Sequence, residues 1–204
     1  FKANYDMLSK LPNRNLLNDR FNLLLSQSKR TNSKLAILFI DLDRFKKIND
    51  NYGHNAGDLL LIKTSERLKK SIRDSDTLAR WGGDEFIILL NNVETKKNIN
   101  IFADRMIEDC SKPVKIDENN SASISLSIGI SIYPDHGDNK IKLLNFENLE
   151  IFIPMFCITF VGTASPIQCL ILSSFFFKNF LFCRGFIIQN RRPPKTFLTF
   201  TVCV

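Results

Sequence analysis

Two pairs of acidic residues stand where the sequence predicts that strands end or turn. Asp41 and Asp43 follow the continuous apolar run 35–40, and Asp84 and Glu85 follow two adjacent glycines. Adjacent carboxylates repel one another unless a cation neutralises them. If the two strands lie side by side, Asp41 and Asp84 converge on one point, and such oxygen ligands suit Mg²⁺ that also binds substrate phosphates. The two pairs therefore indicate metal-dependent chemistry on a nucleoside triphosphate.

Each acidic pair also has a purely structural explanation. A solvated strand end accounts for an Asp-x-Asp pattern taken alone, and a turn that needs positive φ accounts for Gly82 and Gly83. A turn does not, however, need two acids directly after Arg80 and Trp81. The second pair therefore favours the functional explanation.

The segment between the acidic pairs carries residue types that bind nucleotides. Lys46 and Lys47 offer positive charges to phosphate oxygens. Asn49 and Asp58 offer an amide and a carboxylate, which together can read the guanine edge by accepting from its N–H groups and donating to its O6. In the structural alternative, Asp58 caps the following helix and Asn49 sits in a turn.

Other reaction classes have little support in the sequence. His54 follows Gly53 as a lone histidine, which is more typical of a loop or packing residue than of a catalyst. The sequence contains no Walker-type lysine loop and no Ser-His-Asp or Cys-His nucleophile arrangement.

Apolar periodicity predicts the elements that must position these residues. It predicts helices over 14–28, 58–72 and 99–110 and strands over 35–40, 77–81, 86–90 and 124–132. The run 35–40 is predicted to be buried on both faces, whereas 124–132 alternates apolar residues with serines and glycine and is predicted to be half-buried. This order favours an α+β sheet with helices on one face.

Composition fits one globular domain with a short appendage. The 204 residues are 44% hydrophobic and 24% charged, which excludes wholesale disorder. The net charge of +7 comes largely from residues 151–204, which contain basic but no acidic residues. The basic balance is thus a property of the tail, and no nucleic-acid polymer is expected as a partner. The five cysteines show no CxxC spacing, so we predict neither a zinc site nor a disulfide framework. For the first 150 residues we predict a reduced, cytosolic setting.

Four motifs in residues 1–140 resemble the GGDEF family of diguanylate cyclases. They are Asp6-Met7-Leu8-Ser9-Lys10-Leu11-Pro12-Asn13-Arg14, the segment 41–58, Arg80-Trp81-Gly82-Gly83-Asp84-Glu85-Phe86, and Ser127-Ile128-Gly129-Ile130-Ser131-Ile132-Tyr133-Pro134. The resemblance implies a palm-like α+β fold shared with nucleotide cyclases and polymerases. It also implies condensation of two GTP into cyclic di-GMP with release of pyrophosphate, by two domains that meet face to face as a homodimer.

The resemblance implies metal and catalytic roles for five residues. Asp41, the Leu42 carbonyl and Asp84 would bind Mg²⁺ or Mn²⁺. An acid of the Asp84-Glu85 pair would assist deprotonation of the 3′-hydroxyl, with Lys46 beside the nucleotide. The metal would make that oxygen nucleophilic and neutralise charge at the α-phosphate.

The resemblance also implies a substrate site and a regulatory site. Substrate would contact Phe45, Asn49, His54 and Asp58, with Asn49 and Asp58 reading guanine. The Arg73-Asp74-Ser75-Asp76 segment matches the family's Arg-x-x-Asp site, where Arg73 and Asp76 would bind cyclic di-GMP as a feedback inhibitor. The alternative there is a surface ion pair between Arg73 and Asp76 or Asp74.

The sequence departs from the family pattern in two places. Ser9-Lys10 stands where the family usually has Thr-Gly. After Pro134, the family's Tyr-x-Ala-Lys helix pair and Gly-Arg-Asn segment are not found, so basic residues expected at the terminal phosphates are missing and the sheet is expected to lack an edge. We therefore predict an incomplete GGDEF domain over 1–140 and a Phe-rich tail outside the family pattern over 141–204.

The origin of the tail has two explanations. A shifted reading frame or a mispredicted gene end is favoured. The uncharged stretch 151–177 is long enough for a membrane span, although prolines and a glycine interrupt it.

Three functional hypotheses follow. The leading one is a cytoplasmic diguanylate cyclase domain from a bacterial signalling protein, with this chain itself inactive. The others are a non-catalytic GGDEF module that binds GTP or cyclic di-GMP as a regulatory domain, and a membrane-attached fragment. Because the chain begins with Phe1 rather than Met, we expect a longer parent with sensory or phosphodiesterase domains, which a membrane anchor could hold. We recognise no secretory signal at its start.

Overall fold

The structure is a computed structural model that describes residues 3–145 and 150–152. The predictions for the tail 141–204 and for a membrane span over 151–177 fall largely outside these residues. Within them, no helix combines the length and the apolar character needed to cross a membrane.

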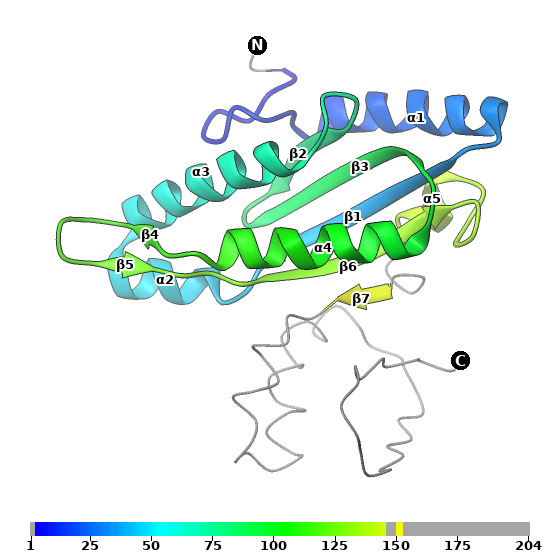
Figure 1. Cartoon of the computed structure of the whole chain (residues 1–204). Helices are drawn as coiled ribbons and strands as arrows, with labels where there is room; N and C mark the ends of the chain where they lie inside the picture. The colour runs from blue at the N-terminus through cyan, green and yellow to red at the C-terminus, as the bar shows by residue number, and fades with distance from the viewer. Residues whose placement is uncertain (1–2, 146–149, 153–204) are drawn as a thin grey trace, which may run out of the picture. The chain divides into compact units, whose positions relative to one another are not determined.

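A five-stranded antiparallel sheet forms the centre of the domain (Figure 1). Its strands, in spatial order, are β2 (Thr77–Gly82), β3 (Glu85–Val93), β1 (Lys34–Leu42), β6 (Leu126–Tyr133) and β7 (Glu150–Phe152). β1 lies between β3 and β6 and pairs with both along most of its length. The strand that ends at Asp41 and Leu42 is therefore the central strand of the sheet.

The edge beyond β6 is occupied, contrary to expectation. Although the sequence after Pro134 departs from the family pattern, Glu150–Phe152 pairs with β6 from Ile128 to Ile130. The prediction that the sheet lacks this edge is wrong for those three positions. Strand pairing uses backbone N–H and C=O groups, so it does not require the family's sequence.

Five helices and a small second sheet complete the described part of the chain. The helices are α1 (Arg14–Thr31), α2 (Phe45–Tyr52), α3 (His54–Ser71), α4 (Lys96–Ser111) and α5 (Lys140–Leu143), and the second sheet pairs β4 (Val114–Lys115) with β5 (Ser121–Ala122). The three predicted helices are confirmed, but the second begins at His54 rather than at 58. The periodicity did not predict α2, because that helix has no fully buried residue.

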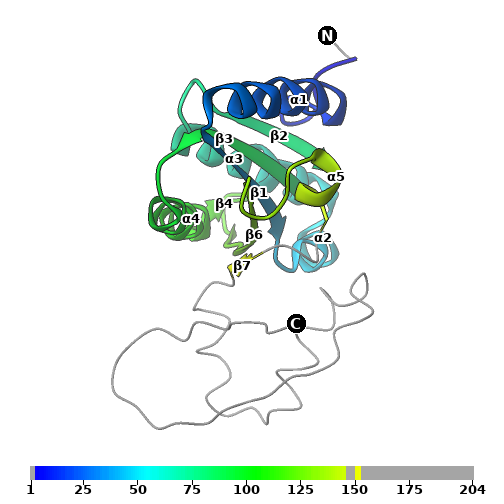
Figure 2. The ribbon, with the colours of Figure 1, turned by 90° about the vertical axis from the view of Figure 1, so that its right-hand side faces the viewer.

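Helices cover both faces of the sheet, so the prediction of helices on one face is wrong (Figure 2). Alternate residues of β1 point to opposite faces. Leu35 and Ile37 pack with Phe21 and other residues of α1, whereas Leu38 and Ile40 pack with residues of α3 and α4. Both packed faces remove apolar surface from water, and the prediction that this strand is buried on both faces is confirmed.

The strand β6 is more buried than its alternating pattern predicted. Ser127 is 6% exposed and Ser131 is fully buried, on the opposite face from Ile128 and Ile130. A half-buried strand was therefore the wrong prediction. Tertiary packing covers the serine face because it lies on the α1 side of the sheet, where Ser131 pairs with Ile37 and α5 packs near β6 with Leu143 in the same core cluster.

Candidate active site

The acidic pairs converge at one end of the sheet. The β2–β3 hairpin turns at Gly82 and Gly83, and Gly83 has a φ of 53° that favours glycine. In the ladder between β1 and β3, Asp41 lies directly opposite Glu85. The hairpin therefore lies beside the strand that ends at Asp41, which is the arrangement that a shared metal site requires.

The acidic cluster is electrostatically strained without a cation. Burial, and then the charges of Asp84, Asp43 and Glu85, raise the pKa of Asp41 from 3.8 to about 7. Burial and the charge of Asp84 also raise the pKa of Glu85, although the charge of Arg14 opposes that rise. A cation beside these carboxylates would favour their ionised forms.

The donor set fits a hard divalent cation that keeps part of its hydration shell. Across residues 3–145 and 150–152, no group of three or more His, Cys, Asp or Glu side chains is arranged to hold a metal. A metal ion held by the two carboxylates of Asp41 and Asp84 would need further oxygen ligands from the backbone, from water or from a substrate. Mg²⁺ binds in this way, through one or two carboxylates together with waters and phosphates.

Asn49 packs directly against Gly57. A Cβ atom built on Gly57 would lie 1.9 Å from Asn49 Oδ1 and 3.1 Å from Phe45 Cζ. Asn49 Oδ1 is buried and has no hydrogen-bond partner. An unsatisfied buried acceptor costs about 1–3 kcal/mol, so this atom is suited to accept from a ligand N–H group.

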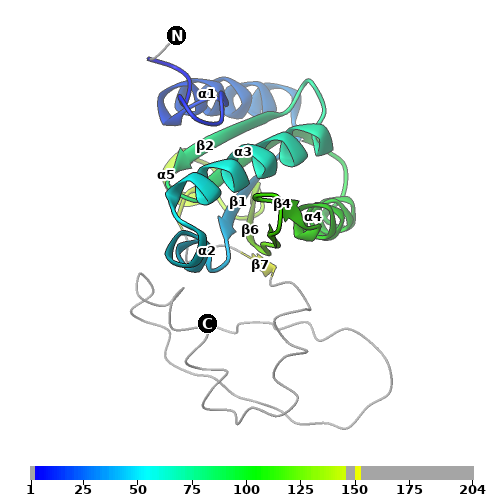
Figure 3. The ribbon, with the colours of Figure 1, turned by 90° about the vertical axis from the view of Figure 1, so that its left-hand side faces the viewer.

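The structural alternatives for Asn49 and Asp58 are wrong. Helix α3 (Figure 3) begins at His54, with Gly53 as its N-cap and no side-chain capping bond. Asp58 therefore lies inside the helix, and it is exposed. Asn49 lies in α2 rather than in a turn, and its backbone carbonyl accepts from Gly53 N at 2.8 Å. Neither side chain therefore has the capping or turn role that the structural alternative gave it.

The remaining predicted substrate residues lie at the starts of α2 and α3. Phe45 is partly buried against the core and begins α2, and Lys46 follows it with an exposed side chain. His54 begins α3 and is exposed. The residue before α2, Arg44, has a left-handed conformation and makes no side-chain capping bond, which leaves the first N–H groups of α2 unsatisfied by a capping side chain.

Arg80, for which no role was predicted, stabilises the hairpin turn. Its Nε and Nη2 donate to the carbonyl of Gly83 at 3.0 and 2.6 Å, and its Nη1 donates to Asp6 Oδ1 at 3.0 Å. Burial acts in the opposite direction, but hydrogen bonds from Ser9 and Arg80 hold the pKa of Asp6 below its ordinary value. The position of Arg80, two residues before Gly82, is the sequence feature that could have indicated this role.

Arg14 adds a second contact at the hairpin. Its guanidinium carbon lies 4.2 Å from the centre of the Trp81 ring, a cation–π geometry. Arg14 begins α1 and Trp81 lies in β2. The contact therefore joins the first helix to the strand that leads into the acidic turn.

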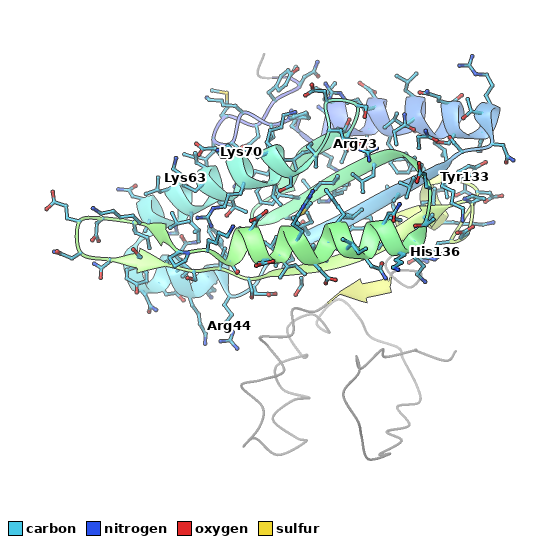
Figure 4. All side chains as sticks on the ribbon, in the orientation of Figure 1. Arg44, Lys63, Lys70, Arg73, Tyr133 and His136 are labelled. Atoms are coloured by element: carbon cyan, nitrogen blue, oxygen red, sulfur yellow. The ribbon has the colours of Figure 1, made fainter. Side chains whose placement is uncertain are left out.

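The predicted regulatory pair is split between a structural residue and an exposed one. Asp76 is 7% exposed, and its two carboxylate oxygens accept from the backbone N–H groups of Arg73 and Asn91 at 3.1 and 3.2 Å. Arg73 is exposed beyond the end of α3 (Figure 4). No ion pair within the described residues joins Arg73 to Asp76 or Asp74, so the surface ion pair is not formed.

A basic cavity of about 390 Å³ lies away from the acidic cluster, beside the end of α3. It is lined by Arg67, Lys70, Ser71, Arg105, Asp109 and Lys112. Arg67 also donates to the carbonyls of Cys110 and Pro113, both at 3.0 Å, and so closes the C-terminal end of α4.

Comparisons with known proteins agree with this fold and this site. The family model described as diguanylate cyclase, GGDEF domain, matches residues 3–147. The diguanylate cyclase TpbB of Pseudomonas aeruginosa is 38% identical over 152 residues, which are 74% of this chain and 35% of TpbB. The bifunctional diguanylate cyclase/cyclic di-GMP phosphodiesterase MucR of the same species is 43% identical over 142 residues, 70% of this chain and 20% of MucR.

Solved structures show the same fold. The GGDEF domain of Pseudomonas aeruginosa TpbB is 40% identical, with a TM-score of 0.67 over 69% of this chain and 81% of that chain. The GGDEF domain of DgcB from Caulobacter crescentus, solved in complex with c-di-GMP, is 22% identical, with a TM-score of 0.62 over 67% of this chain and 81% of that chain.

An α+β domain with paired acids at a glycine hairpin beside its central strand is the arrangement of a nucleotide cyclase. The chain belongs to the GGDEF family of diguanylate cyclases. Members of this family use a divalent metal ion. The chain spans about a third of the length of TpbB and a fifth of that of MucR.

Proposed function

We propose that this domain condenses two GTP molecules into cyclic di-GMP, with Mg²⁺ held by Asp41, the Leu42 carbonyl and Asp84. The observation that carries the proposal is the cluster of Asp41, Asp84 and Glu85, in which the pKa of Asp41 is raised to about 7. A bound Mg²⁺ would neutralise this cluster and the charge that grows at the α-phosphate.

Other groups of the chain would transfer the proton and bind the phosphates. One acid of the Asp84-Glu85 pair, of which Glu85 lies opposite Asp41 in the ladder, would accept the proton of the attacking 3′-hydroxyl as pyrophosphate leaves. Lys46, exposed at the start of α2, would hold phosphate oxygens as a point charge. The unsatisfied N–H groups at the start of α2 would support the same anion.

Guanine recognition is assigned to Asn49 and Asp58. The buried, unpartnered Oδ1 of Asn49 would accept from a guanine N–H, and the exposed carboxylate of Asp58 would accept from another. Phe45 and His54 would contact the nucleotide from the starts of the two helices. Adenine presents a different pattern of donors and acceptors, so these residues would select GTP.

Each domain would hold one GTP, so the catalytic unit would be a homodimer with its two sites face to face. Cyclic di-GMP would return as an inhibitor and bind at Arg73. Because the carboxylate of Asp76 already accepts two backbone N–H groups, its contribution would be to shape the loop around Arg73. The domain would work in the cytoplasm, as part of a parent protein that a membrane anchor could hold.

The decisive experiment measures cyclic di-GMP formation from GTP and Mg²⁺ by purified protein. We expect the 204-residue chain to bind GTP without turnover, because the family's phosphate-binding ending is missing from its sequence, and a chain with that ending restored in frame to turn over. In the restored chain, Asp84→Ala should lower the rate by about 10²–10³-fold, and Asp58→Ala should relax discrimination against ATP.

Two outcomes would contradict the proposal. If Asp84→Ala retained more than half the turnover at saturating Mg²⁺, Asp84 would not belong to the metal site. If the restored chain bound GTP and cyclic di-GMP but made no product, the domain would be a regulatory module rather than an enzyme.

A further inference from the structure

Asp43, the second acid of the Asp-x-Asp pair, is held by two serines of the neighbouring strand segment. Its Oδ2 accepts from the Ser125 hydroxyl at 2.5 Å, and its Oδ1 accepts from the Ser127 hydroxyl at 2.6 Å. The backbone N–H of Asp43 also donates to the Ser125 carbonyl at 3.0 Å. Hydroxyl donors to a carboxylate form short, charge-assisted bonds, so two hydroxyls hold the carboxylate and a third bond holds the backbone of the same residue.

These bonds place the carboxylate of Asp43 on the β6 side of β1. β1 has β3 on one side and β6 on the other. Glu85 lies opposite Asp41 on the β3 side, whereas Ser127 lies opposite Asp41 on the β6 side. Both oxygens of Asp43 therefore already accept from serine hydroxyls on the β6 side, while its charge still acts on the neighbouring Asp41.

The bonds also fix the turn that leads into α2. Arg44 follows Asp43 with a φ of 61° and a ψ of 25°, a left-handed conformation that is unfavourable for a residue with a side chain. Such a conformation persists where the surrounding structure determines it. The next residues, Phe45 and Lys46, begin the helix that carries Asn49.

We propose that Asp43, Ser125 and Ser127 form a clasp that positions the start of α2 for nucleotide binding, and that Asp43 is not a metal ligand. This inference rests on the proposed function, because it assigns the clasp to the same nucleotide site. It also gives a function to two of the serines in the alternating segment 124–132. A misplaced binding group costs affinity even when the fold survives.

The test uses the full 204-residue chain and three measurements: the Kd of a fluorescent GTP analogue with Mg²⁺, the binding of Mn²⁺ alone by electron paramagnetic resonance, and the Tm. The variants are Asp43→Asn and the double variant Ser125→Ala/Ser127→Ala. The matched control is Asp117→Asn. Asp117 accepts from the N–H groups of Asn119 and Asn120 between β4 and β5, so the control also disturbs an acid that receives several hydrogen bonds.

We expect the double serine variant to raise the Kd of the GTP analogue by about 10-fold. The control Asp117→Asn should leave that Kd unchanged, even where the two variants lower the Tm equally. Asp43→Asn should lower the affinity for Mn²⁺ by less than about fivefold, the effect of one nearby charge in water. Asp41→Asn, the reference for a metal ligand, should remove Mn²⁺ binding. If the double variant does not fold, Ser127→Ala alone is measured against the same control.

Three results would overturn the inference. Loss of Mn²⁺ binding in Asp43→Asn, equal to that in Asp41→Asn, would make Asp43 a metal ligand. An unchanged Kd for the GTP analogue in the serine variants would make the clasp a structural feature only. Failure of the unsubstituted chain to bind the GTP analogue would overturn the proposed function and the positioning role together.

Discussion

At the end of the central strand, Asp41 is a partly buried carboxylate among other carboxylates. Its pKa, raised from 3.8 to about 7, means that the folded domain without metal holds a proton that the unfolded chain has already released. A group with a raised pKa contributes stability that is complete below pH 3.8 and is lost as the pH rises through about 7. Metal binding and folding stability are therefore both linked to pH at this residue.

We expect the Tm of the chain to depend on pH through Asp41. Without divalent metal, the Tm of the 204-residue chain should contain a component that falls between pH 4 and about 7 and that is absent in Asp41→Asn. Mg²⁺ should raise the Tm most at the upper end of that range, because the proton no longer competes with it. Parallel pH profiles for the two proteins would show that Asp41 is not the group that titrates.

Helices α2 and α3 meet at Gly57, and this contact decides where Asn49 can lie. Alanine is normally more favourable than glycine inside a helix by about 1 kcal/mol. At Gly57, however, the added Cβ would lie 1.9 Å from Asn49 Oδ1. The clash falls on the atom to which we assign guanine recognition.

Gly57→Ala should therefore displace Asn49 and lower the affinity for the GTP analogue by about 10-fold or more, with no gain in Tm. The matched control is the double variant Gly57→Ala/Asn49→Ala, which removes the clash. Its Tm should recover above that of Gly57→Ala, while its affinity for GTP stays weak. Unchanged affinity in Gly57→Ala would separate Asn49 from the nucleotide.

In the loop between α3 and β2, we expect Arg73 to affect regulation and Asp76 to affect stability. Arg73→Ala should relieve inhibition by added cyclic di-GMP in the restored chain, with initial rates and Tm nearly unchanged, because its side chain is exposed. Asp76→Ala should instead lower the stability by about 1–3 kcal/mol, because two backbone N–H groups lose their acceptor. Dose–response curves and thermal melts separate the two effects. Equal sensitivity of wild type and Arg73→Ala to the product would leave Arg73 without a regulatory role.

For the whole molecule, the prediction concerns solubility. The stretch 151–177 has no charged residue and the tail is rich in phenylalanine, so the 204-residue chain should be poorly soluble. Deleting 153–204 keeps β7 and should raise the soluble yield without producing turnover. Deleting 146–204 should also raise it, but less, because it exposes the edge of β6 to other chains.

The measurement is the soluble fraction and the oligomeric state of the three chains after identical expression. A soluble full-length dimer that converts GTP to cyclic di-GMP would contradict the interpretation of the tail as sequence outside the family. Recovery of folded protein only with detergent would favour the membrane hypothesis.

Much of the site could be predicted from the sequence, because its signals are local. The acids after a buried run, the glycines before Asp84 and the Asn49–Asp58 segment each occupy a short stretch. The buried strand 35–40 and the helices over 14–28 and 99–110 are likewise local patterns, since periodicity reports which residues of one element are apolar.

Only the tertiary structure decided which faces were covered and which distant residues met. Sequence periodicity cannot say that α1 covers one face while α3 and α4 cover the other, or that the serine face of β6 is buried. Arg80 and Asp6 are 74 residues apart, and Asp43 and Ser127 are 84 residues apart. Such contacts depend on how the chain returns to the same place, and a local pattern carries no information about that return. The sequence determined which residues could do the chemistry, and the fold determined which of them are free to do it.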